Sequence, residues 1–176
     1  MIQYSSNYEV APCSRVYLRN YAKQLREILK IDTPYFPVCQ LLEILPILDI
    51  QYDCIDDETW DAVYGKENHA QYDLLNKTIS IKEAVYVGAC ENHGRDRYTI
   101  AHEIAHALLL DSNNITLNRT SSDKQSKLYT NPEWQADCLA GELLIPKHLC
   151  ENMSAEEIMD ACAVSYEAAC YQKRRF

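Results

Sequence analysis

The sequence predicts an α+β fold that is mostly helical and contains a small antiparallel or mixed β-sheet. Two observations carry this prediction. Apolar residues recur at helical spacing among charged residues over much of the chain, whereas segments suited to short strands are confined to residues 50–81. The length of 176 residues suits one domain whose core needs no disulfide support. We therefore expect a single domain over residues 1–176.

The first half of the chain is expected to hold two helices and the sheet. An amphipathic pattern predicts a helix over residues 14–31, and a second helix follows at 38–45 after two prolines. Residues 50–55 alternate as a short strand does. Residues 70–75 and 78–81 predict a hairpin with a two-residue turn at Asn76 and Lys77.

The second half is expected to be helical. After a loop at 88–95, a strongly apolar helix is predicted from Asp96 to Leu110, followed by a polar stretch at 111–130 whose composition indicates a functional or mobile loop. Asn131 and Pro132 form an N-cap pattern, and the helix they start should end before Pro146. Two short helices at about 154–162 and 165–174 are expected to form a hairpin that closes the core.

Composition and charge disfavour several classes of protein. The chain has 17 basic and 26 acidic side chains, a net charge of −9 and a pI near 5.0, which argues against nucleic acid or an anionic membrane as the main partner. No apolar run approaches the roughly 18 residues of a membrane span. The first residues lack the basic start and apolar centre of a signal peptide. We therefore expect a cytoplasmic protein.

The eight cysteines do not form a metal-binding pattern. A structural zinc site requires closely spaced pairs, and no two cysteines are separated by two to four residues. In a reducing compartment they are expected to be free and mostly buried thiols.

The segment His102-Glu-Ile-Ala-His106 carries the strongest chemical signal. Histidines at positions i and i+4 lie on one face of a helix, about 5.4 Å apart along its axis. Neutral imidazoles at this separation can bind one Zn²⁺, and Glu103 can act as general base toward water at the metal. Such a pattern would arise by chance in roughly one comparable sequence in a hundred.

A catalytic zinc site needs a third protein ligand, and Glu133 is the best candidate. It lies in the first turn of the predicted helix after Asn131, and Asp137 follows on the same face. Glu133 would bind the metal while Asp137 accepts a hydrogen bond from the far nitrogen of one histidine. An acid in the first turn can also simply complement the helix dipole. Small residues at Ala136, Ala140 and Gly141 favour the metal interpretation, because they would let the two helices approach closely.

Two segments resemble the motif helices of the ImmA/IrrE family of zinc-dependent endopeptidases. They are Arg97-Tyr-Thr-Ile-Ala-His-Glu-Ile-Ala-His-Ala-Leu-Leu109 and Glu133-Trp-Gln-Ala-Asp-Cys-Leu-Ala-Gly-Glu-Leu-Leu-Ile-Pro146. The resemblance extends over roughly residues 15–150. It departs from the family at Tyr98, where phenylalanine is usual, and at Leu139, where an aromatic residue is usual. It implies a minimal zincin-like, gluzincin-like core with the small sheet packed on the histidine helix.

The resemblance also implies roles for individual residues. His102, His106 and Glu133 match the metal ligands, Glu103 the catalytic acid/base, and Asp137 the residue that supports a ligand. Members of the family typically cleave helix-turn-helix repressors, releasing genes of mobile elements or stress responses. The ligand set also admits Mn²⁺, Fe²⁺ or Co²⁺ in place of zinc.

Alternatives remain open on the residues alone. A non-catalytic regulatory protein could use the same metal-stabilised cleft to bind a repressor, although such a protein needs no general base at Glu103. A DNA-binding regulator is disfavoured by the charge. Candidates for stabilising an oxyanion are, without a choice among them, Tyr98, Tyr129, His93 and His148.

Overall fold

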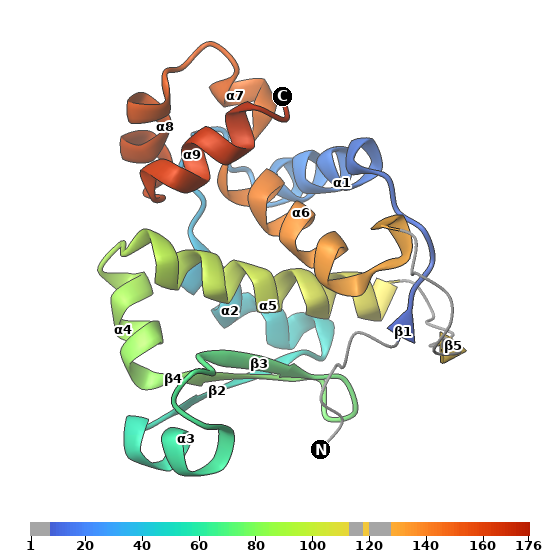
Figure 1. Ribbon diagram of the computed structural model, residues 1–176, viewed down its shortest axis with the longest axis vertical. Coiled ribbons are helices and arrows are strands. Elements are labelled where there is room, and N and C mark those ends of the chain that lie inside the picture. Colours follow the sequence, from blue (N-terminus) through green and yellow to red (C-terminus); the bar gives the residue numbers. More distant parts are fainter. Residues whose placement is uncertain (1–7, 113–117, 120–127) are drawn as a thin grey trace.

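The computed structural model describes residues 8–112, 118–119 and 128–176. Within these residues the chain has the predicted α+β fold, dominated by helices (Figure 1). A small sheet lies at one end of the molecule, a long central helix lies across it, and a group of C-terminal helices lies at the opposite end.

The elements follow one another in an order that begins with β1 (Tyr8–Glu9), α1 (Arg15–Ile28), α2 (Val38–Ile44), the 3₁₀ turn η1 (Leu45–Leu48), β2 (Gln51–Ile55), α3 (Asp57–Tyr64), β3 (Ala70–Asp73), β4 (Thr78–Lys82), α4 (Glu83–Cys90) and α5 (Gly94–Ser112). The remaining elements are β5 (Asn118–Arg119), η2 (Leu128–Thr130), α6 (Pro132–Leu144), α7 (Lys147–Cys150), α8 (Ala155–Cys162) and α9 (Tyr166–Lys173).

The main sheet is mixed and has the strand order β2-β4-β3. β2 runs parallel to β4 with α3 in the connection, and β3 runs antiparallel to β4. β4 alternates as a half-buried strand should, so that Ile79 and Ile81 are fully buried. β3 and β4 both contact α5, which confirms that the sheet packs on the histidine helix.

The turn between β3 and β4 is longer than predicted. It spans residues 74–77 rather than two residues. The Asp73 carboxylate accepts hydrogen bonds from the backbone N–H groups of Leu75 and Asn76 at 2.9 and 3.2 Å, so a side chain organises the turn. Lys77 has a φ of 48°. A two-residue turn of type I′ needs this left-handed geometry at both central positions, which Asn-Lys does not favour.

Three helices were not predicted from the sequence: α3, α4 and the short α7. α3 starts at a conventional cap, where Asp56 accepts a hydrogen bond from the backbone N–H of Thr59 at 3.0 Å. α4 follows β4 without a side-chain cap and contains valine and glycine, which weaken a helical pattern. It occupies part of the segment expected to be a loop, and α5 starts two residues earlier than predicted.

α6 lies between α5 and α1, and both interfaces are extensive (Figure 1). Ala136 and Ala140 are fully buried, as expected for close helix packing. Gly141 has a different role from the one predicted. A Cβ at this position would lie 3.0 Å from the side chain of Gln172 on α9, so this glycine makes room for the C-terminal helix. Glu142 is buried and pairs with Arg19 of α1 through two hydrogen bonds of 2.9 and 3.0 Å.

The C-terminal helices α8 and α9 pack against each other and contribute Ile158, Cys162 and Ala169 to the main core. Arg97 joins them to α5. Its fully buried guanidinium donates hydrogen bonds to the carbonyl oxygens of Ala163, Phe36 and Cys162 at 3.0, 2.8 and 3.3 Å.

All eight cysteines are free thiols, as predicted, but only four are buried. None of the helices in the described residues is long and apolar enough to span a membrane. The expectation for the N-terminal residues 1–7, and most of the one for the polar stretch 111–130, falls outside the described residues.

Candidate metal centre

The central helix α5 presents three of the predicted site residues. His102 and His106 lie one turn apart, with ring centroids separated by 4.7 Å and their Nε2 atoms 3.0 Å apart. Ile100, Ile104 and Ala107 are fully buried in the core. The same helix therefore holds both a core face and the histidine pair.

Glu133 comes from the first turn of α6 and meets the two histidines. Its Oε2 lies 3.3 Å from Nε2 of His102 and 3.4 Å from Nε2 of His106. Asn131 sets the start of α6, because its side chain accepts a hydrogen bond from the backbone N–H of Trp134 at 3.1 Å. Gln135 holds the same turn in place by donating to the carbonyl oxygens of Ala11 and Tyr129, each at 2.7 Å.

The spacing of the three donor atoms fits a bound transition-metal ion. Two ligands bound at 2.0–2.1 Å in tetrahedral geometry are about 3.3 Å apart. The observed separations of 3.0, 3.3 and 3.4 Å lie close to this value. Within the described part of the chain, this is the one cluster of histidine, cysteine and carboxylate ligands with such a spacing. Two imidazoles and one carboxylate suit zinc and also other divalent transition metals.

Asp137 supports His102 from the side opposite Glu133. Its Oδ1 lies 2.9 Å from Nδ1 of His102, as predicted, and accepts a second hydrogen bond from the Tyr98 hydroxyl at 3.0 Å. The contact with Nδ1 leaves Nε2 of His102 as the atom that could bind a metal. Tyr98 was predicted as one of several candidates for stabilising an oxyanion. Its hydroxyl is instead directed to the carboxylate behind His102, an arrangement that a phenylalanine could not make.

Glu103 projects toward the sheet and is held by β3. Its Oε2 accepts a hydrogen bond from the backbone N–H of Tyr72 at 2.8 Å. The sequence did not predict this partner, because every residue except proline has a backbone N–H and the type of residue 72 therefore does not indicate the contact. The contact fixes one carboxylate oxygen and leaves the other available for proton transfer.

Burial and hydrogen bonds shift the pKa values of the site residues in opposite directions. Burial raises the pKa of Glu103. The hydrogen bonds from His102 and His106 lower the pKa of Glu133. For His102, burial opposes the charged form, but hydrogen bonds to Asp137 and Glu133 outweigh it and raise its pKa to about 10. These opposite shifts of pKa favour a protonated His102 beside an ionised Glu133.

The other proposed oxyanion residues lie in different surroundings. Tyr129 packs edge-on against Trp134 with ring centroids 5.3 Å apart. His93 lies before the start of α5, 3.5 Å from Asp96. His148 lies on α7, where burial and the charges of Lys23 and Arg26 lower its pKa. None of these contacts points to a role at the metal centre.

The fold and the site together define a helical α+β domain with a two-histidine, one-glutamate candidate metal site. Residues 62–172 match the IrrE N-terminal-like domain, peptidase family M78, and the chain belongs to this family. The family is one of metallopeptidase type. No curated protein shows a significant match to the chain.

Proposed function

We propose that this protein is a zinc-dependent endopeptidase that hydrolyses a peptide bond in a specific partner protein, a DNA-binding repressor of the helix-turn-helix class. The observation that carries the proposal is the convergence of His102, His106 and Glu133 on one point, with the partly buried carboxylate of Glu103 beside them. Membership of a peptidase family supports the same reaction.

A divalent metal held by His102, His106 and Glu133 would polarise the scissile carbonyl as a Lewis acid and would make water more acidic. Glu103 takes a proton from the attacking water and passes it to the departing amine. Its raised pKa suits both transfers, because the group must first accept and then release the proton. Asp137 holds His102 in the orientation and tautomer that bind the metal.

The charge of the chain supports a protein partner rather than a nucleic acid. A net charge of −9 repels phosphate backbones and attracts the basic surface that a DNA-binding protein carries. We expect the reaction to take place in the cytoplasm, where eight free thiols are ordinary.

The Glu103→Gln variant tests the proposal. Glutamine keeps the size of the side chain and an oxygen that can accept the Tyr72 N–H, but it cannot take a proton. We would first find, among helix-turn-helix repressors, one that the zinc-loaded variant binds, and then incubate this repressor with zinc-loaded wild-type protein. We expect cleavage by the wild type and intact repressor with the variant.

The alternative function predicts a different result. If the wild type and Glu103→Gln bind the repressor equally and both leave it intact, the protein is a metal-stabilised binding protein and the enzymatic proposal is wrong. Equal zinc affinity of the two proteins, measured by competitive titration, is the control that the variant has kept its metal site.

A further inference from the structure

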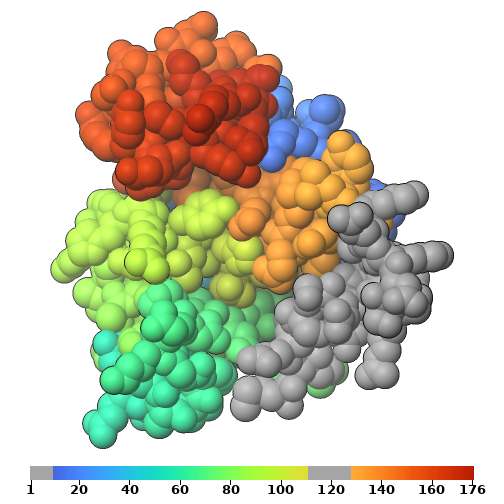
Figure 2. Space-filling view, in the orientation of Figure 1, coloured from blue at the N-terminus to red at the C-terminus, as the bar shows by residue number. Residues whose placement is uncertain are grey.

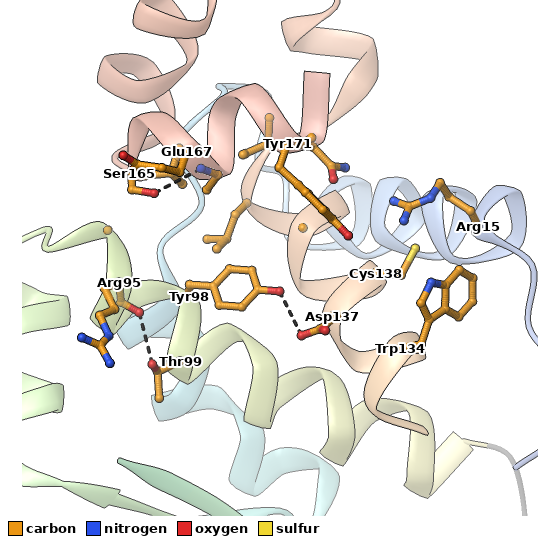
Figure 3. Close-up of a pocket in the computed structure, with 17 residues that line it drawn as sticks. Arg15, Arg95, Tyr98, Thr99, Trp134, Asp137, Cys138, Ser165, Glu167 and Tyr171 are labelled. Carbon is orange, nitrogen blue, oxygen red and sulfur yellow. Dashed lines mark hydrogen bonds between the residues drawn. The ribbon is translucent and has the colours of Figure 1, made fainter. Parts of the chain in front are cut away.

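A cavity of about 720 Å³ opens beside the metal centre, between α5, α6, α9 and the start of α1 (Figure 3). The surface is notched at this place, where the C-terminal helices meet α5 and α6 (Figure 2). A volume of this size lies within the range of ligand-binding sites. It is large enough for several amino-acid side chains and much larger than a bound water.

The cavity adjoins the metal centre, although none of the three donor residues lines it. Asp137 lines it and contacts His102, and Tyr98 lines it with its ring centroid 6.4 Å from that of His102. Trp134 lines it and directly follows the ligand Glu133. Glu103 lies toward β3, away from this cavity. A peptide with its scissile bond at the metal would reach the cavity by passing Asp137 and Tyr98.

The walls of the cavity are mainly apolar. Aromatic rings come from Tyr98, Trp134 and Tyr171, and aliphatic side chains come from Leu144, Ile145 and Val164. This lining favours apolar side chains in an occupant.

The charged side chains in the lining leave little attraction for a charged ligand. Asp137 is engaged by His102 and Tyr98, and Arg15 lies 3.5 Å from Glu142. Figure 3 shows the Arg95 guanidinium directed away from Tyr98. Glu167 contributes a negative charge to the lining, opposite in sign to the charge of Arg95. No single sign of charge dominates the cavity.

We propose that this cavity binds an apolar segment of the protein substrate next to the scissile bond, and that Tyr171 of α9 is a specificity-determining residue. The inference rests on the proposed function, since it takes the occupant to be the substrate. Tyr171 reaches from α9 toward Tyr98 and Asp137 (Figure 3), and half of its surface (51%) is exposed. The Arg175 guanidinium lies over its ring, 3.3 Å from the centroid. Tyr166 lies on the same helix with a similar exposure of 44%, but outside the cavity lining.

The first experiment asks what binds and where. The zinc-loaded Glu103→Gln chain, labelled with ¹⁵N, is titrated with acetyl-Ala-Leu-Leu-Ala-amide and, as matched probes, with the same peptide carrying Glu-Glu or Lys-Lys. The chain has two tryptophans. The indole N–H signal of Trp134 reports on the cavity, and that of the fully buried Trp60 is an internal reference. We expect the Leu-Leu peptide to move the Trp134 signal and the amide signals of α9. Equal binding of a charged peptide, or signal changes only elsewhere, overturns the proposal.

The second experiment compares two tyrosine variants. Tyr171→Ala is expected to weaken binding of the Leu-Leu peptide by about fivefold, because apolar contact area is lost. Tyr166→Ala should leave the affinity unchanged. Ala168→Trp fills the cavity from the same helix and is expected to weaken binding by about tenfold. Circular dichroism melts identify any variant that fails to fold. Equal effects of Tyr171→Ala and Tyr166→Ala contradict the assignment.

The peptide titration tests the cavity independently of the enzymatic function. The titration is repeated with a chelator in place of zinc, and it measures binding without cleavage. Peptide binding in the cavity combined with intact repressor in the cleavage assay would reject the enzymatic function and keep the pocket. Cleavage of a repressor without peptide binding in the cavity would support the enzymatic function and reject the cavity as a substrate-binding site.

Discussion

Replacing Asp137 by alanine tests how strongly the carboxylate behind His102 controls metal binding. Asp137 Oδ1 lies 2.9 Å from His102 Nδ1 and 3.0 Å from the hydroxyl of Tyr98. Losing it leaves the imidazole free to rotate and to place its proton on Nε2, the atom that must bind the metal. Removal of such a partner costs about 10- to 100-fold in metal affinity. Because the Asp137 side chain is 56% exposed, water replaces part of the contact. We expect a loss of about tenfold, or about 1.4 kcal/mol.

The affinity is measured by competition with a chromophoric zinc chelator at pH 7.5. Tyr98→Phe removes only the second hydrogen bond to Asp137 and should give a smaller loss, about twofold to threefold. Asp160→Ala, at an exposed aspartate of α8, is the matched control and should bind zinc as the wild type does. Zinc affinity of Asp137→Ala within twofold of the wild-type value, with the fold intact by circular dichroism, would refute the reasoning.

Three further predictions concern protons and packing. Zinc binding at pH 7.5 should release about one proton from His102, because the pKa of this residue is raised to about 10. Calorimetric titrations in buffers of different ionisation enthalpy measure the number of protons released. When a chelator has removed the metal, the His102–Glu133 pair should stabilise the fold most near pH 5–6.5. Above this range the stabilisation declines because His102 loses its proton as the pH rises toward 10. Below this range it declines because the Glu133 carboxylate becomes protonated. Thermal melts of wild type and Glu133→Gln should converge at both extremes. Arg97→Met should lower the free energy of unfolding in urea by about 3 kcal/mol, against less than about 0.5 kcal/mol for exposed Arg95→Met.

Much of the fold was predictable because its signals are local. The caps at Ser14, Asn131 and Ser154 each accept the backbone hydrogen bond expected of an N-cap, and the helices they start lie where the sequence placed them. The pair His102 and His106 is equally local, because its spacing fixes its geometry on any helix. These features depend on neighbours within four residues.

The features that the sequence did not reveal depend on distant contacts. α4 carries a weak helical pattern and is completed by packing against α5, α2 and β4. Gly141 was assigned to the wrong interface, because composition alone does not say which neighbour a small residue faces. The partner of Glu103 is a backbone N–H 31 positions earlier in the chain, which no motif records. Tyr98 differed visibly from the family pattern, and its carboxylate partner, 39 residues away, could be identified only in three dimensions.

The metal donors are brought together by contacts that involve no metal. Gln135 fixes the turn of α6 that carries Glu133, and the buried pair of Glu142 and Arg19 joins the other end of α6 to α1. Arg97 fixes the start of α5 against the C-terminal helices. A zinc finger, by contrast, folds only when its metal binds. Here contacts between protein groups place the donors, so we expect the chain to keep its fold when the metal is removed. Catalytic sites profit from such preorganisation, because the ligands are already placed when the substrate arrives.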